Sequence, residues 1–271
     1  MFLRSRVDKR IDIGWTDAVS SLKSWRVWLL LGWQDIRLRY RRSQLGPLWI
    51  TISTSIMIFM MGFLYGHLFK SDLSTYYPFL TTGIIAWTFI STVMNESNDC
   101  FIEAQSYIRQ LNLPFGVYVF RLLTRNVIVL AHNLIPIIVV LIIFRVEISF
   151  FQIAQLIFGL FLVLVTGYGY GMILAIFGAR FRDLKPIIGS LIQVAFFVTP
   201  IMWQPSMLSD RYKLAYDLNP FYQLVSLIRG PLTGHDLSWH VLVYSVFMAG
   251  SGLFLLMLLM SRVRHRIAYW V

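Results

Sequence analysis

The sequence predicts an all-α integral membrane protein with six transmembrane helices. Hydrophobic residues make up 57% of the 271 residues and charged residues only 14%, whereas soluble domains carry roughly a quarter charged residues. Stretches near the ~20-residue length that crosses a bilayer, all free of Asp, Glu, Lys and Arg, cover residues 47–69, 78–94, 126–144, 150–179, 186–202 and 241–260. Composition excludes a water-soluble domain and a disordered chain.

Basic residues predict the topology. The segments that flank the six spans, taken alternately, hold 19 Lys and Arg on one side and 5 on the other. The positive-inside rule therefore places both termini in the cytoplasm. We expect a cytoplasmic N-terminus over 1–46, a membrane domain over 47–260 and a cytoplasmic tail over 261–271. The net charge of +11 lies around apolar stretches, so we expect membrane lipids as partners and no nucleic acid.

An amphipathic helix is expected before the first span, because hydrophobic residues recur there at intervals of three or four. The stripe consists of Leu22, Trp25, Leu29, Trp33, Ile36 and Tyr40. Its tryptophans and arginines suit a helix in the cytoplasmic headgroup layer. Such a helix is either a simple anchor or also a site for an anionic headgroup or a partner protein.

Two connections between spans have patterns of their own. Residues 95–112 are polar but carry an apolar stripe, which predicts a short cytoplasmic helix between spans two and three that is either a solvated connector or docks into a partner's groove. Residues 204–240 predict two short periplasmic helices between spans five and six. The spacing of Phe221, Leu224 and Ile228 indicates that the second half dips back against the membrane.

No residue set supports catalysis or metal binding. All acidic residues fall outside the spans, which argues against a proton-coupled carrier. The chain lacks a phosphate-binding G-x-x-x-x-G-K-[ST] loop, has one cysteine, and spaces its five histidines unlike metal ligands. We therefore expect no catalytic residue, metal or cofactor in this chain. A membrane-embedded glycosyltransferase is the less favoured alternative, because Asp72, Glu147 and Asp183 are isolated.

His132 lies deep in the third span and precedes Pro136. Because proline has no N–H, a carbonyl one turn earlier loses its usual donor. We expect a structural hydrogen bond here rather than a functional histidine.

The first and fifth spans carry small and polar faces that either pack tightly or line a translocation path. The candidate lining residues are Thr51, Ser55, Gly62, Ser190 and Gln193. Aromatic residues near the outer ends of these spans either line the same path or form an interfacial belt: Tyr65, Phe196, Phe197 and Trp203. Gly62 with Gly66, and Gly167 with Gly171, have the spacing that lets helices approach closely.

Residues 33–49, WQDIRLRYRRSQLGPLW, closely resemble the start of the first span in ABC-2 type permeases that export O-antigen, capsular polysaccharide or teichoic acid. Weaker similarities are Leu113-Pro114, Thr199-Pro200-Ile201, and Leu218-Asn219-Pro220-Phe221 followed by Arg229. The resemblance implies a homodimeric permease in the bacterial inner membrane, paired with two copies of a cytoplasmic ABC ATPase that binds ATP and Mg. The implied cargo is a polyprenyl-pyrophosphate-linked glycan, with a small hydrophobic compound or lipid as the alternative.

The resemblance also implies roles for individual residues. The first and fifth spans of both subunits would line the channel, and the loop Leu45-Gly46-Pro47 would open with the first span. Arginines that either receive the lipid pyrophosphate or only set the topology are Arg37, Arg39, Arg41 and Arg42. The helix after span two would couple to the ATPase through Glu96, Phe101, Glu103, Ala104, Tyr107, Ile108 and Leu111.

Overall fold

A computed structural model describes residues 14–41, 43–46 and 48–271. The predictions for Arg42 and Pro47 lie outside these residues. Within them every regular element is helical. Five helices are long and apolar enough to cross a membrane: α3 (Leu48–Leu68), α4 (Leu73–Glu103), α6 (Gly116–Ile143), α7 (Phe150–Arg180) and α11 (Trp239–Trp270). They overlap the predicted spans one, two, three, four and six.

The fifth predicted span is shorter than expected. It corresponds to α8 (Leu184–Val198), whose 15 residues extend only about 22 Å at 1.5 Å per residue, against a hydrocarbon core of about 30 Å. The helix ends before Thr199 and Pro200 because the residue before a proline is disfavoured in helical conformation. A sixth full span therefore stays a prediction.

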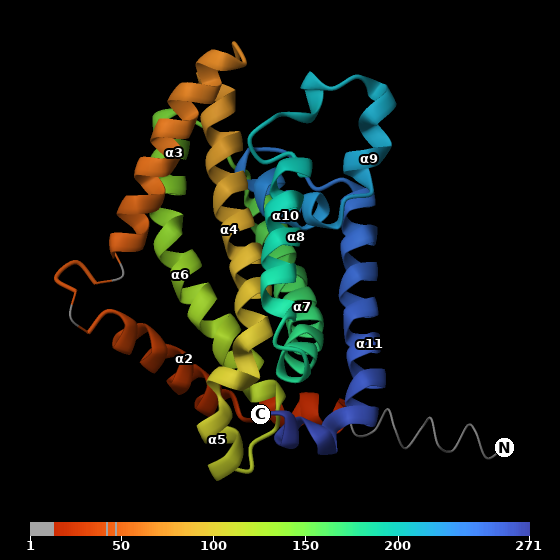
Figure 1. Cartoon of the computed structure of the whole chain (residues 1–271). Helices are drawn as coiled ribbons and strands as arrows, with labels where there is room; N and C mark the ends of the chain where they lie inside the picture. The colour runs from red at the N-terminus through yellow and green to blue at the C-terminus, as the bar shows by residue number, and fades with distance from the viewer. Residues whose placement is uncertain (1–13, 42, 47) are drawn as a thin grey trace.

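The bundle has two distinct ends (Figure 1). The α5 end gathers α2 (Trp25–Arg39), α5 (Gln105–Gln110) and the last turns of α11. The opposite α9 end carries α9 (Lys213–Asp217) and the 3₁₀ turns η1 (Pro205–Met207) and η2 (Asp210–Tyr212). The N-terminal helix, the connection after span two and the tail thus share one end, as the charge pattern predicts.

The core lies around α4, which packs against α3, α6, α7, α8 and the re-entrant helix α10 (Pro220–Leu232). Asp72 begins α4, where its carboxylate accepts hydrogen bonds from the backbone N–H and the hydroxyl of Ser74. These bonds lower the pKa of the Asp72 carboxyl, with the side-chain bond as the main cause. Helix α10 packs between α4, α7 and α11, and the prediction that this segment dips back against the membrane stays a prediction.

Two helices continue beyond the predicted apolar stretches. Residues 95–103 are the last turns of α4 rather than part of the separate helix predicted for residues 95–112, and α5 begins only after a break at Ala104. Residues 261–270, predicted as a cytoplasmic tail, extend α11. Both continuations bury hydrophobic side chains, with Phe101 and Ile267 fully inaccessible.

A glycine permits a close approach between α7 and α4. A Cβ atom added to Gly178 on α7 would lie 2.0 Å from the backbone oxygen of Asn98 on α4. A backbone atom cannot move aside as a flexible side chain can. Glycine at this position is therefore required for α4 and α7 to pack at the distance observed.

Candidate functional site

An ion-pair cluster at the α5 end joins α2, α4 and α6, and consists of Asp35, Glu96, Arg121 and Arg125. Arg121 donates Nε and Nη2 to the two carboxylate oxygens of Asp35, at 2.7 and 2.6 Å. Arg125 donates Nη2 to Glu96 at 2.8 Å, and its Nη1 lies 3.5 Å from Asp35. A two-pronged guanidinium–carboxylate pair fixes orientation as well as distance. The cluster therefore sets the position of α2 relative to both spans.

Sequence reasoning missed most of this cluster, identifying only Glu96. The available signal was the pair Arg121 and Arg125, four residues apart at the polar start of an apolar helix. Residues with that spacing share one helix face. Asp35 gave no such signal, because its partners are 86 residues or more away in sequence.

Helix α2 packs through a different face from the predicted apolar stripe. The packed face carries Trp28, which stacks on Phe120 at 5.4 Å, and Gly32, which is buried against Thr124. Within the stripe Ile36 is buried, while Trp25 and Trp33 are half exposed. The two faces lie roughly a quarter turn apart on a helix of 3.6 residues per turn. One face thus packs on the bundle and leaves Trp25 and Trp33 of the stripe uncovered.

The arginines near the end of α2 are not equivalent. Arg39 lies 3.5 Å from Glu96, so part of its charge is compensated within the chain. Arg37 and Arg41 are exposed. Leu45 is also exposed, and Gly46 has a φ of 55°, a left-handed conformation that favours glycine. Gly46 donates its N–H to the hydroxyl of Ser43, which closes the turn between α2 and α3.

The first residues of the predicted apolar stripe of the coupling segment pack against the bundle, whereas Leu111 at its end is exposed. Phe101 and Ala104 are buried, and the Phe101 ring contacts Phe115 at 5.6 Å. Tyr107 and Ile108 are half-buried, with Arg121 lying over the Tyr107 ring. Within residues 101–112 the exposed side chains are Glu103, Ser106, Arg109, Gln110, Leu111 and Asn112.

Val271, the residue that follows α11, holds α5 in place. Gln105 and Arg109 donate side-chain hydrogen bonds to the Val271 carbonyl, at 2.5 and 3.0 Å. Trp270 lies beneath the guanidinium of Arg180 on α7. A force applied to α5 therefore reaches α4 through the chain and α11 through these bonds.

The small face of α3 packs within the subunit, so it does not form an open wall in this chain. Thr51 is buried and donates to the His132 carbonyl, while Ser55 donates to the Thr51 carbonyl. Gly62 lies against the ring of Tyr77 on α4, where an added Cβ would be 2.3 Å from a ring carbon. The opposite face of α3 is exposed and includes Ile56, Phe59 and Phe63.

Helix α8 presents its polar residues outward. Ser190, Gln193 and Phe197 are exposed. Phe196 contacts Trp87 and Phe197, and Trp203 donates its indole N–H to the Phe197 carbonyl. Three of the four predicted aromatic residues thus meet beside α8. Tyr65 belongs to a separate group on α3 and stacks on Phe69 at 5.6 Å.

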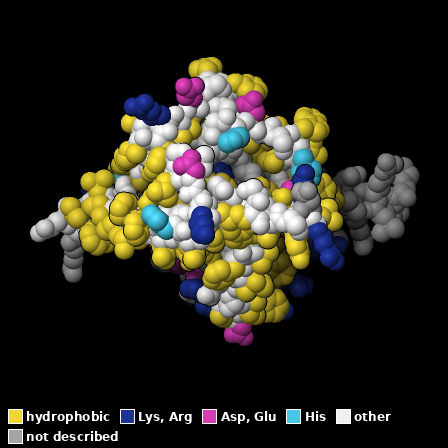
Figure 2. Space-filling view, turned by 90° about the horizontal axis from the view of Figure 1, so that it is seen from above, with side chains coloured by type: hydrophobic (Ala, Val, Ile, Leu, Met, Phe, Trp, Pro, Cys, Tyr) yellow, Lys and Arg dark blue, Asp and Glu magenta, His cyan; other side chains and the backbone are white. Residues whose placement is uncertain are grey.

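The α9 end carries charged side chains of both signs. Seen along the bundle from this end, charged and histidine side chains are scattered singly among hydrophobic and uncharged polar ones (Figure 2). Among the described residues, no group of three or more His, Cys, Asp or Glu side chains is placed to hold a metal ion.

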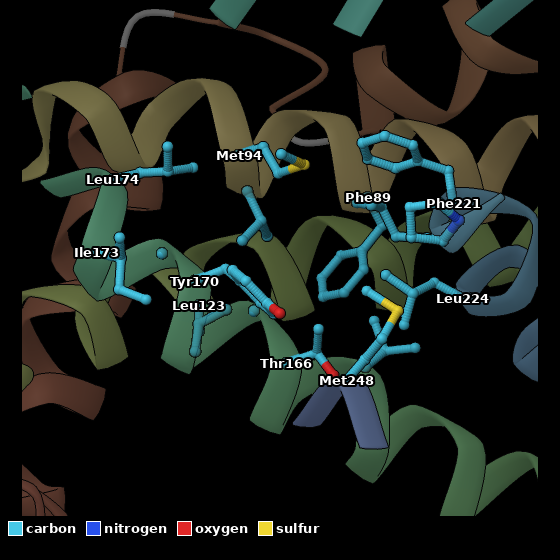
Figure 3. Close-up of a pocket in the computed structure, with 16 residues that line it drawn as sticks. Phe89, Met94, Leu123, Thr166, Tyr170, Ile173, Leu174, Phe221, Leu224 and Met248 are labelled. Carbon is cyan, nitrogen blue, oxygen red and sulfur yellow. The ribbon is translucent and has the colours of Figure 1, made fainter. Parts of the chain in front are cut away.

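An apolar cavity of about 300 Å³ lies inside the bundle (Figure 3). Its walls come from α4, α6, α7, α10 and α11, and include Phe89, Tyr170, Phe221, Leu224 and Met248. Sequence reasoning missed this cavity. Gly167 and Gly171 on α7 line it, so the small-residue spacing contributes empty space as well as close packing.

Residues 26–233 match the model of the ABC-2 type transporter family. The chain belongs to this family. The matched region runs from α2 through α10 and includes the ion-pair cluster, α5 and both aromatic groups.

Curated relatives of this ABC-2 chain are polysaccharide export proteins. An O-antigen export system permease protein RfbA of Klebsiella pneumoniae is 21% identical over 71% of this chain and 74% of its own length. An RfbA of Myxococcus xanthus is 23% identical over 75% and 79%. The polysialic acid transport protein KpsM of Escherichia coli is 22% identical over 72% and 77%.

Proposed function

We propose that this chain is the permease subunit of a bacterial exporter that moves a polysaccharide outward across the inner membrane. The observation that carries this proposal is the similarity to O-antigen and polysialic acid export proteins along more than 70% of the chain. The five helices of spanning length support a membrane-embedded role. In this proposal the α5 end faces the cytoplasm, with both termini, and the α9 end faces outward.

Transport is driven by two copies of a separate ATPase, which binds ATP and Mg and contacts the α5 end. The exposed side chains of Arg109, Gln110 and Leu111 offer that contact. Movement of α5 is passed to α4, because only the break at Ala104 separates them. The ion-pair cluster then carries the movement to α2 and α6.

The transporter is a homodimer in which α3 and α8 of both subunits surround the polymer. Exposed faces of both helices support this arrangement, because they carry large apolar residues that one subunit leaves uncovered. Phe197 and Gln193 on α8 offer an aromatic surface and an amide beside each other. Aromatic rings contact the C–H faces of sugars without demanding one registry, which suits a sliding polymer.

The cargo is a glycan linked to a polyprenyl pyrophosphate, received at the α2 end of the path. Arg37 and Arg41 are the better placed of the four arginines, since both are exposed and Arg39 is paired with Glu96. Guanidinium groups bind phosphate through two parallel hydrogen bonds. The exposed Trp25 and Trp33 support a position of α2 in the headgroup layer.

Deletion of the gene, followed by separate staining of surface and inner-membrane glycan, tests the proposal. We expect polymer to accumulate on the cytoplasmic side, and the wild-type chain to restore surface polymer. Normal surface polymer in the deletion strain would contradict polysaccharide export. The second candidate, export of a small hydrophobic compound or lipid, would then be favoured, and the apolar cavity beside Phe221 and Leu224 supports it.

A further inference from the structure

The apolar cavity lies at the start of α10 and continues the gap that this helix fills. Helix α10 packs between α4, α7 and α11 and begins at Pro220. Ahead of that residue the space among the three long helices, together with α6, is left open as the cavity. Phe221 and Leu224 lie on one side of it, and Ile173 and Leu174 lie on the other (Figure 3).

The cavity is elongated along α7 and lies at the depth of the hydrocarbon core. Its lining residues on α7 run from Val163 to Leu174, a length of roughly 16 Å at 1.5 Å per residue. They occupy the middle of a 31-residue helix, which is longer than the ~20 residues that cross a bilayer. Pro220 is exposed and Leu174 half-buried, so the cavity is partly open at its rim.

The walls offer almost nothing to a polar ligand. Among the lining residues only Thr166 and Tyr170 have polar side chains, and none is charged. The Tyr170 hydroxyl lies 3.0 Å from the hydroxyl of Ser251, with which it shares a hydrogen bond. The hydroxyl oxygen of Thr166 is buried. The accessible surface of the cavity is therefore made of hydrocarbon groups and aromatic rings.

An apolar cavity of this size is unfavourable when it is empty. An engineered apolar cavity of about 150 Å³ stays dry and binds benzene, whereas this cavity measures about 300 Å³. Atoms that face a void lose their van der Waals contacts, and the cost increases with the volume of the void. Water finds too few hydrogen-bond partners on these walls to fill the space. The suitable occupant is apolar and comes from the membrane.

We propose that the apolar cavity binds one hydrocarbon chain, which is either an acyl chain of a membrane lipid or the chain of a polyprenyl lipid. A single extended chain matches the length of the space, and its lack of polar atoms matches the walls. The headgroup stays outside, at the partly open rim. The proposal rests on the position of the bundle in the membrane and holds whatever compound the transporter exports.

Photo-crosslinking of the full chain in nanodiscs tests the proposal. One probe is a phosphatidylcholine with a diazirine on an acyl chain, and the other is a polyprenyl phosphate with a diazirine on its chain. We expect labelling of residues 89–94 on α4, which line the cavity in part. Labelling by the first probe identifies a membrane lipid, labelling by the second identifies a polyprenyl lipid, and labelling by both indicates a site for either chain. Absence of labelling at these residues with both probes would overturn the proposal.

Two variants fill the cavity from different helices. A Cβ at Gly167 would lie 3.4 Å from Leu123 and 3.5 Å from Val93, which are ordinary contacts between lining residues. Gly167→Leu should therefore fold, place its side chain in the cavity and remove most of the labelling at residues 89–94. Met248→Phe narrows the cavity from α11 and should have the same effect if Gly167→Leu does not fold.

Gly250→Leu is the matched control, because it makes the same change at a glycine of α11 where a Cβ has no neighbour within 4 Å. It should retain the labelling at residues 89–94. In every variant the exposed face of α3, at Phe59 and Phe63, should stay labelled by surrounding lipid. Full labelling at residues 89–94 in a folded Gly167→Leu or Met248→Phe protein would show that no chain occupies the cavity.

Discussion

The hydroxyl of Thr51 on α3 donates a hydrogen bond to the backbone carbonyl of His132 on α6, over 3.2 Å. That carbonyl lacks its helical partner because residue 136, four positions on, is proline and has no N–H. In a membrane an unsatisfied carbonyl is costly, and a side chain from a neighbouring helix is one way to satisfy it. Thr51 thus compensates for a break in another helix.

Replacing Thr51 with valine tests this relationship while keeping the side-chain shape. We expect a loss of about 0.6 to 1.5 kcal/mol in the free energy of unfolding, the usual range for a hydrogen bond between membrane helices. The measurement is reversible unfolding in mixed micelles. Pro136→Ala restores the N–H donor to the His132 carbonyl. Adding Thr51→Val to that variant should then cost clearly less. Equal costs in both backgrounds would show that the hydroxyl does not serve this carbonyl.

The ion-pair cluster predicts that Asp35→Asn destabilises the attachment of α2. Arg121 would lose its two-pronged partner in a site where both side chains are mostly buried, with 16% and 12% exposed. We expect a cost of about 3 kcal/mol, as for other broken buried pairs, and faster protease cleavage near residue 44. Arg39→Gln is the control, because that pair is longer and its arginine 46% exposed. Its cost should stay below about 1 kcal/mol. Similar costs for both variants would refute a dominant role for Asp35.

The contact of α3 with α4 depends on the absence of a side chain at residue 62. In Gly62→Ala the new methyl group would meet the Tyr77 ring, which is itself held by a hydrogen bond to Phe59 and by stacking on Phe144. We expect a lower melting temperature and reduced export.

Gly250→Ala, on α11, is the matched control for this effect. A Cβ at residue 250 has no neighbour within 4 Å, so alanine there should be neutral or stabilise by up to about 1 kcal/mol. A Gly62→Ala protein as stable as Gly250→Ala would show that the ring moves aside at little cost.

The α5 end predicts different outcomes for two hydrophobic residues of the same sequence stripe. Leu111 is 48% exposed, whereas Phe101 is fully buried. Leu111→Glu should leave the melting temperature unchanged and weaken co-purification with the partner ATPase. Phe101→Ala should cost about 3 to 5 kcal/mol in stability. A Leu111→Glu variant that co-purifies normally and exports normally would place the ATPase contact elsewhere.

Much of the architecture was predictable because the membrane imposes a length on apolar helices. The five helices of spanning length all overlap predicted spans, and residues 220–232 pack against α4, α7 and α11. The orphaned carbonyl near His132 was also expected, since it follows from the chemistry of proline. These are local features, and each depends on residues within a few positions of each other.

The features that sequence reasoning missed depend on partners far apart in the chain. Hydropathy ends a span at the first polar residue, yet α4 continues to Glu103, and Glu96 in this continuation is paired with Arg125 from α6. Periodicity identified the apolar stripe of residues 101–111 but not which neighbour covers it. The cavity beside Phe89 and Tyr170 is bounded by side chains from five helices, so its presence cannot be predicted from the sequence of any one helix.

Helix α2 is held in both position and rotation. The two-pronged pair between Asp35 and Arg121 prevents the helix from rolling, and Trp28 and Gly32 fix its distance from α6. The exposed Trp25 and Trp33 lie a quarter turn from this packed face. Because the rotation of α2 is fixed, these two rings cannot adjust to a lipid surface by rotating about the helix axis. If those rings lie in the headgroup layer, as we propose, a change in bilayer thickness would act on α6 as a torque.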